Sequence, residues 1–239
     1  EMCIRDREDF ISAELEAVPA GPARDYGIDR SMIMGYGHDD KVCAYPSLAA
    51  LLNADNLDKT GVCVLVDKEE IGSVGATGMH SRFFENVVAE LVALTEGESE
   101  LKVRRALQNY RMLSSDVSAA YDPMYAEAFE KRSAAFFGKG LVFNKFTGAR
   151  GKSGSNDANA EYLGILRKAF DDAKVEYQTA ELGRIDAGGG GTIAYIPAAY
   201  GMDVIDIGVP ILNMHAPYEV SSKADVYETT KCYKAFYEM

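Results

Sequence analysis

Residues 61–73 read Gly-Val-Cys-Val-Leu-Val-Asp-Lys-Glu-Glu-Ile-Gly-Ser, an apolar run that ends in a pair of glutamates. The continuous apolar run 61–66 is typical of a β-strand that is buried on both faces. In open α/β sheets, ligands gather beyond the carboxyl ends of the strands. Glu69 and Glu70 stand at such an end, where one carboxylate can bind a metal ion and the other can take a proton from water. A solvated acidic turn is the alternative for an isolated pair.

Strand-like and helix-like segments alternate along the rest of the chain. The apolar patterns predict strands at 111–115, 141–143, 175–180 and 202–207. Helices are predicted at 43–54, 157–172, 192–200 and 219–237, and where Phe84, Val87, Val88 and Leu91 recur at helical spacing. Asn156 or Asp157 is the expected N-cap of the second helix. Such alternation indicates an α/β architecture with a largely parallel sheet.

The N-terminal segment follows another pattern. Residues 10–18 mix apolar and polar side chains in near alternation, and Pro19, Gly21 and Pro22 then break the pattern. We therefore interpret residues 8–34 as a strand and loops of a separate β-rich element. Residues 1–7 fit neither pattern and are interpreted as a tag or a sequencing artefact.

Composition excludes several classes of partner. The net charge of −12 would repel phosphate backbones and anionic lipid surfaces, so neither nucleic acid nor a membrane is an expected partner. No stretch approaches the roughly 20 apolar residues of a membrane-spanning helix. The four cysteines form no Cys-x-x-Cys pair, which disfavours a thiolate metal site and predicts a cytoplasmic location.

Three further residues could act as metal ligands. Asp39 follows His38 and precedes a predicted helix, so it suits a cation but could equally be an N-cap. Asp116 ends a predicted strand, where a turn residue is the alternative. His215 lies in the loop Asn-Met-His-Ala-Pro, and histidines in such loops are more often structural.

A glycine-rich turn precedes the predicted helix at 192–200. Residues 186–192 read Asp-Ala-Gly-Gly-Gly-Gly-Thr, and glycines such as Gly190 let the backbone approach a ligand closely. The turn is neither a Walker loop nor a dinucleotide-binding fingerprint, because the flanking residues of both motifs are missing. A flexible turn is the alternative.

The joint occurrence of these groups says more than any one of them. Carboxylates and a histidine at successive strand ends converge in space, and oxygen and imidazole ligands together fit zinc or manganese better than magnesium. A Ser or Cys nucleophile triad is disfavoured, because the chain has three histidines and no Gly-x-Ser-x-Gly elbow.

Several ordered motifs resemble the aspartyl aminopeptidase family of dinuclear zinc exopeptidases, most closely its bacterial branch. The motifs are GYGHDDKVCAY (35–45), DKEEIGS (67–73), SSDVSAAYDP (114–123), TGARGKSGSNDA (147–158), DAGGGGTIA (186–194) and NMHAP (213–217). The resemblance implies a three-layer α/β/α zinc-exopeptidase-like domain with a central, mostly parallel sheet, spanning residues 35–239. It also implies that residues 8–34 are the tail of an inserted β-rich domain.

The resemblance also assigns roles to the candidate residues. Asp39 is similar to the carboxylate that bridges two zinc ions, and Glu70 and His215 to the further ligands of one of them. Asp116 resembles a ligand of the other zinc ion, and Glu69 resembles the general base that takes the proton of the attacking water.

The resemblance implies that the substrates are peptides with an acidic N-terminal residue. It also implies that the full-length protein is a homo-oligomer. Such substrates need a cation in the pocket, for which we choose Lys145 over Arg150 and Lys152, with a solvated basic loop as the alternative. Gly190 is the expected backbone contact to substrate.

The chain departs from the family pattern in one respect. Family members carry a further histidine ligand upstream of the matched segment, and neither His38 nor His80 replaces it by position. We therefore expect the N-terminal part of the catalytic sheet to be missing and the chain alone to be inactive. The competing hypotheses are a related tetrahedral or glutamyl-type metalloaminopeptidase and a non-catalytic assembly module of the same fold.

Overall fold

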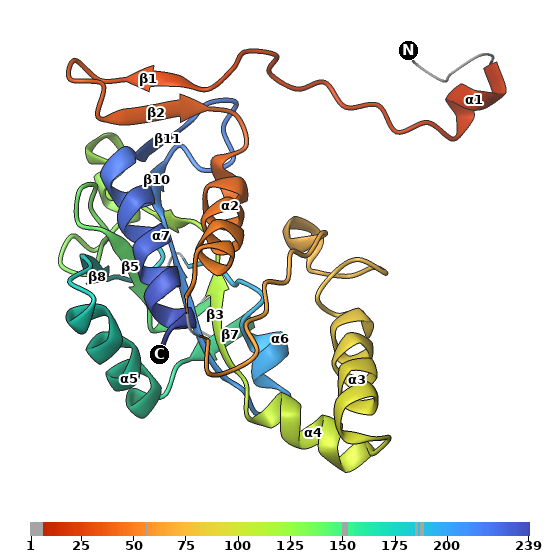
Figure 1. Ribbon diagram of the computed structural model, residues 1–239. Coiled ribbons are helices and arrows are strands. Elements are labelled where there is room, and N and C mark those ends of the chain that lie inside the picture. Colours follow the sequence, from red (N-terminus) through yellow and green to blue (C-terminus); the bar gives the residue numbers. More distant parts are fainter. Residues whose placement is uncertain (1–6, 56, 150–152, 185, 187–188) are drawn as a thin grey trace.

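The computed structural model describes residues 7–55, 57–149, 153–184, 186 and 189–239 (Figure 1). Its helices are α1 (Arg7–Ile11), α2 (His38–Leu52), α3 (Phe83–Glu96), α4 (Glu100–Gln108), α5 (Ala160–Asp172), α6 (Tyr195–Ala198) and α7 (Lys223–Tyr237), with 3₁₀ turns η1 (Glu69–Ile71) and η2 (Pro123–Ala128). Its strands are β1 (Arg24–Tyr26), β2 (Met32–Gly35), β3 (Arg111–Ser115), β4 (Ser118–Ala119), β5 (Leu141–Asn144), β6 (Phe146–Ala149), β7 (Ser153–Asp157), β8 (Tyr177–Thr179), β9 (Asp203–Gly208), β10 (Pro210–Leu212) and β11 (Glu219–Ser222). None of the helices described is long and apolar enough to cross a membrane.

A four-stranded sheet in the order β3-β9-β5-β8 forms the centre of the molecule. β3 runs parallel to β9 and β5 runs parallel to β8, whereas β5 and β9 are antiparallel. The predicted α/β class and central, mostly parallel sheet are therefore confirmed, with one antiparallel pair at the middle of the sheet. A second sheet, β1-β2-β11-β10-β4, is parallel only between β10 and β4, and β6 and β7 form a separate hairpin.

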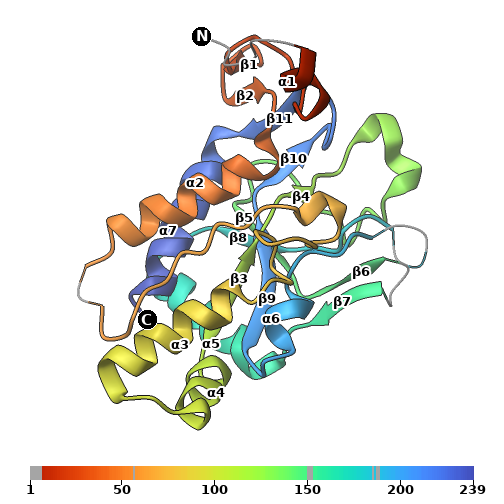
Figure 2. The same ribbon diagram turned by 90° about the vertical axis from the view of Figure 1, so that its right-hand side faces the viewer.

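Strand β9 separates two cores because successive side chains of a strand point to opposite faces. Ile205 and Ile207 pack with α2, α5 and α7 on one face, and Val204 packs with α3 and α4 on the other. Figure 2 shows α2 and α7 side by side, with α6 and the β6–β7 hairpin across β9 from them. Helices on both faces give the expected three-layer arrangement.

The parallel pairing of β3 with β9 continues past the end of the central sheet. The amide of Asp116 donates to the carbonyl of Ile207 at 3.0 Å, and the amide of Ser118 donates to that of Val209 at 2.9 Å. The two strands thereby pass together into β4 and β10 of the second sheet. Gly208 lies at the crossing, where a Cβ would overlap the carbonyl oxygen of Asp116 and approach Cys43 Sγ to 3.2 Å. Only glycine fits there.

The expectation of a strand at 61–66 is wrong. These residues form no regular element, and no strand among the described residues pairs with them. A cleft of about 180 Å³ separates them from the outer edge of β3, with Val62–Val66 and Tyr110–Leu113 among its lining residues. A strand needs a partner for its amides and carbonyls, so the apolar run has the composition of a buried strand without the pairing.

Four predicted helices begin or end elsewhere. The helix predicted at 43–54 spans His38–Leu52. The helix predicted at 219–237 starts at Lys223, because residues 219–222 form β11 between β2 and β10. Of the helix predicted at 192–200, only Tyr195–Ala198 is helical. The helix predicted at 157–172 starts at Ala160, because Asn159 accepts from the amide of Tyr162 and is the N-cap in place of Asn156 or Asp157. Propensity alone missed the boundaries of all four helices, and helix α4 was not predicted.

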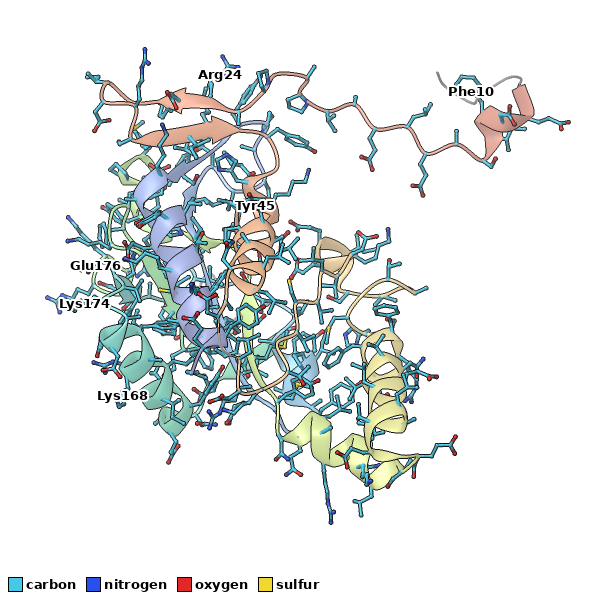
Figure 3. All side chains as sticks on the ribbon, viewed as in Figure 1. Phe10, Arg24, Tyr45, Lys168, Lys174 and Glu176 are labelled. Atoms are coloured by element: carbon cyan, nitrogen blue, oxygen red, sulfur yellow. The ribbon has the colours of Figure 1, made fainter. Side chains whose placement is uncertain are left out.

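Residues 12–23 form an extended arm, and the strand predicted at 10–18 is absent. The arm leads away from the body to the short helix α1, and Figure 3 shows Phe10 far from the sheets. Leu15 is 68% exposed, although a strand with alternating apolar side chains needs one buried face. The chain after this arm is better anchored, since β2 pairs with β11.

We expect Gly208→Ala to destabilise the protein by more than about 3 kcal/mol, because overpacking against backbone atoms cannot relax. Gly164→Ala in α5 is the matched control, since a Cβ there meets no atom within 4 Å. That control should stabilise the helix by about 1 kcal/mol. Urea denaturation of both variants measures the two effects, and equal stabilities would contradict the close crossing.

Candidate metal centre

The two glutamates lie on a tight turn that their neighbours close. Lys68 and Ser73 both have positive φ, at 70° and 61°, and the amide of Ser73 donates to the carbonyl of Lys68 at 2.7 Å. Within the turn, Glu69 is half-buried and Glu70 is exposed. The turn thus points adjacent carboxylates in different directions, which the two roles predicted for them require.

Asp39, Glu70 and His215 come together from three separate segments. Asp39 follows β2 at the start of α2, and His215 lies in the loop between β10 and β11 with φ 66°. His215 Nε2 lies 3.1 Å from Asp39 Oδ2 and 3.1 Å from Glu70 Oε1. All three ligand atoms fall within 4.8 Å of one another, and in the part of the chain described no other such group occurs.

This spacing fits a zinc ion. Ligands about 2 Å from a tetrahedral zinc lie roughly 3.3 Å from one another. The two imidazole–carboxylate distances of 3.1 Å are close to that separation. Two carboxylates and one imidazole are also a ligand set that zinc accepts. Asp39, Glu70 and His215 could therefore hold one zinc ion.

Asp116 lies near this group but is not part of it. It occupies the crossing between β3 and β4, and its Oδ1 accepts from the amide of Val117 at 2.7 Å. Burial, followed by the carboxylates of Asp39 and Glu69, raises the pKa of Asp116 well above its usual value. Asp116 therefore shares the electrostatic environment of the group.

The pKa values of Asp39 and Glu69 are raised, which shows that too little positive charge lies near these carboxylates. Burial raises the pKa of Asp39 to about 6, with Glu70 adding to the rise and His215 opposing it. Burial also raises the pKa of Glu69, and the Glu70 and Asp39 carboxylates raise it further. Like charges crowd a half-buried space, and a divalent cation would favour the ionised form of each carboxylate.

Sequence reasoning missed Glu219, the first residue of β11. Glu219 is only 2% exposed, and its two carboxylate oxygens accept from the amides of Asp39 (3.1 Å) and His215 (2.9 Å). The sequence predicted a helix from residue 219, and a glutamate in the first turn of a helix is common and indicates no special role.

The other two histidines are not members of the three-ligand group. His38, interpreted from the sequence as a neighbour of the ligands, is buried, and burial lowers its pKa. His80 Nε2 lies 3.0 Å from the hydroxyl of Tyr195, which connects the segment after the glutamate turn to α6. Neither is a ligand of the group.

The residues predicted to bind substrate lie outside the three-ligand group. Lys145, between β5 and β6, forms an ion pair with Asp157, and its charge opposes the burial that raises the pKa of Glu181. Gly190 accepts from the amide of Gly148 at 3.0 Å, so the glycine-rich turn rests on the β6–β7 hairpin. Arg150 and Lys152 lie outside the described residues.

A buried carboxylate ties these segments to β9. Asp206 is 2% exposed and accepts from the hydroxyls of Thr147 (2.8 Å) and Thr192, while Asn156 Nδ2 lies 3.5 Å away. Burial raises the pKa of Asp206 to about 7, while hydrogen bonds from Thr147, Asn156 and Ser114 lower it. Asp206 thereby fixes the hairpin and the glycine-rich turn to one strand.

Comparison with known proteins places the chain in a family. A family model described as aminopeptidase I zinc metalloprotease (M18) matches residues 2–237. A curated relative from Clostridium acetobutylicum, named probable M18 family aminopeptidase 1, is 64% identical over 96% of this chain and 49% of its own length. The chain spans about half the length of the curated relatives it matches.

Solved structures share the fold. The M18 aminopeptidase from Thermotoga maritima superposes with a TM-score of 0.93 at 44% identity, covering 97% of this chain and 51% of that one. The mApe1 dodecamer of S. cerevisiae has a TM-score of 0.75 at 21% identity, covering 92% of this chain and 48% of that one.

We expect the stability gained by Asp206→Asn, relative to the parent, to grow between about pH 4 and pH 7. A carboxyl group whose pKa is raised from 3.8 to about 7 holds its proton more tightly in the folded state. Its contribution is fully present below the unfolded pKa and is lost as pH rises through the folded pKa. The change should be on the order of a few kcal/mol. Urea denaturation of both metal-free proteins across this range tests it, and a pH-independent difference would contradict it.

Proposed function

We propose, because the chain belongs to the aminopeptidase I zinc metalloprotease (M18) family, that this protein is a zinc-dependent aminopeptidase. The observation that carries the proposal is the placement of His215 Nε2 at 3.1 Å from a carboxylate oxygen of both Asp39 and Glu70. These three residues would hold one zinc ion. Asp39 and Asp116 would contribute to a second.

When bound, zinc supplies Lewis acidity, which lowers the pKa of a water molecule and polarises a carbonyl group. Glu69 precedes the proposed ligand Glu70 on the same turn but does not belong to the three-ligand group. Its raised pKa suits a group that takes a proton from the attacking water and then gives it to the leaving amine. We assign Glu69 as the general base on this ground.

The described residues supply two unequal parts of a dinuclear centre. Asp39, Glu70 and His215 form a complete three-ligand set, whereas Asp116 can share only Asp39. We infer that the isolated 239-residue chain binds one zinc ion and turns over poorly.

Peptides with an acidic first residue are the proposed substrates. Lys145 is the proposed recognition cation and Gly190 the proposed backbone contact. Lys145 is already paired with Asp157, so an acidic substrate must compete with that carboxylate. We also propose a homo-oligomer, as for the related dodecamer.

Zinc content is the direct test of the metal centre. Elemental analysis of the purified chain should find about one zinc per chain, and Asp39→Ala should lose it because a ligand is removed. Glu69→Gln should retain zinc, since Glu69 is not a ligand. Zinc that persists in Asp39→Ala would reject the site.

Turnover is measured in a chimera that adds the unmatched part of the C. acetobutylicum relative to this chain. Glu69→Gln should lower kcat by about 10²- to 10⁴-fold, the range for loss of a general base. An unchanged kcat would reject that role for Glu69, and robust activity of the isolated chain would reject its proposed inactivity.

Lys145→Gln in the chimera should reduce the preference for Asp-initiated over Leu-initiated peptides by roughly 10- to 100-fold, the value of one hydrogen bond to a charged group. Lys168 (Figure 3) is the matched control, because it pairs with Asp172 at 2.5 Å on the exposed face of α5. Lys168→Gln should leave the preference unchanged. Equal effects of the two variants would reject Lys145 as the residue that recognises an acidic substrate. An unsubstituted chimera that prefers Leu-initiated peptides would reject the proposed specificity itself.

A further inference from the structure

Glu219 contacts the backbones of two proposed zinc ligands that lie 176 residues apart, at positions 39 and 215. Each carboxylate oxygen has its own amide: Oε2 accepts from Asp39 and Oε1 accepts from His215. Glu219 itself is fixed, because it is 2% exposed and its backbone pairs with Gly35 at the end of β2. One rigid side chain thus spans the start of α2 and the β10–β11 loop.

Burying a carboxylate is costly unless it is hydrogen-bonded. In the described part of the chain, no lysine or arginine forms a salt bridge with Glu219. The two amides therefore provide its hydrogen bonds, and hydrogen bonds to an ionised acceptor are about twice as strong as neutral ones.

We propose that Glu219 is a positioning residue that sets the spacing of Asp39 and His215 for zinc, an inference that rests on the proposed metal centre. Its two oxygens hold the amides of both ligands at once. The backbones of Asp39 and His215 are then confined before metal arrives, so less conformational freedom is lost on binding. Partners that orient metal ligands in this way typically contribute 10- to 100-fold to metal affinity.

The test compares Glu219→Gln and Glu219→Ala with a matched control, Asp225→Asn. Asp225 is also fully buried and also accepts from two backbone amides, those of Gly138 (2.9 Å) and Gly140 (2.8 Å). Neither glycine is a proposed ligand, so this control reproduces the loss of a buried charged acceptor without touching the metal centre.

Two measurements are made on the 239-residue chain. Amide hydrogen exchange of the metal-free protein should become at least about 10-fold faster at Asp39 or His215 in Glu219→Gln, because an amide side chain offers one acceptor oxygen. Both amides should exchange faster in Glu219→Ala. Zinc affinity, measured by competition with a chelator, should fall roughly 10- to 100-fold in both variants. Asp225→Asn should lower stability and change neither quantity.

Unchanged exchange at both amides, or a loss of zinc affinity in Asp225→Asn equal to that in Glu219→Ala, would overturn the proposal. If the unsubstituted chain binds no zinc, the metal centre of this chain is rejected. Exchange then still decides the role of Glu219: faster exchange confined to Asp39 and His215 supports it as the link between the two segments, and unchanged exchange overturns it.

Discussion

The continuous parallel pairing of β3–β4 with β9–β10 is the constraint on which the rest of the structure depends. It crosses from one sheet to the other at Asp116 and Gly208, where the backbones come too close for any side chain at 208. The crossing places Asp116 beside the metal centre and directs β10 toward the loop that carries His215. A shift of one residue in this pairing would move Asp116 away from Asp39 and turn the side chains of β9 to the wrong faces.

In the proposed metal centre, repulsion between partly buried carboxylates opposes folding. Asp39 and Glu70 contact the imidazole of His215, while Glu69 and Asp116 interact electrostatically with Asp39. Burial raises the pKa of Asp39, Glu69 and Asp116. Such crowding destabilises a protein without a cation, because ionised carboxylates repel one another most where water is scarce. Retaining this arrangement is easier to explain for a cation-binding centre than for an assembly module, whose fold would be more stable with fewer charges there.

Local signals made part of the molecule predictable. The strand at 111–115 follows from a short apolar run with a polar end and lies where predicted. The glutamate turn forms although the strand predicted directly before it, at 61–66, does not. The three-ligand group was predicted because each residue stands beside such an element, although only the family resemblance separated ligands from caps. Tertiary pairing decided the rest: residues 61–66 have strand composition but no partner, and residues 219–222 join β2 and β10 although the sequence favours a helix. Glu219 escaped prediction for the same reason, since its role is defined only by two segments distant in sequence.

Strand β9 connects the proposed metal centre to the proposed substrate-binding region. Ile205 and Ile207 anchor it in the core beneath α5 and α7, while Asp206, between them, binds the hairpin and the glycine-rich turn. The strand then continues into β10 and the His215 loop. The proposed substrate-recognition segments and the loop of His215 are thus both attached to the continuous strand β9–β10, and the two regions need no direct contact with each other to be held in place.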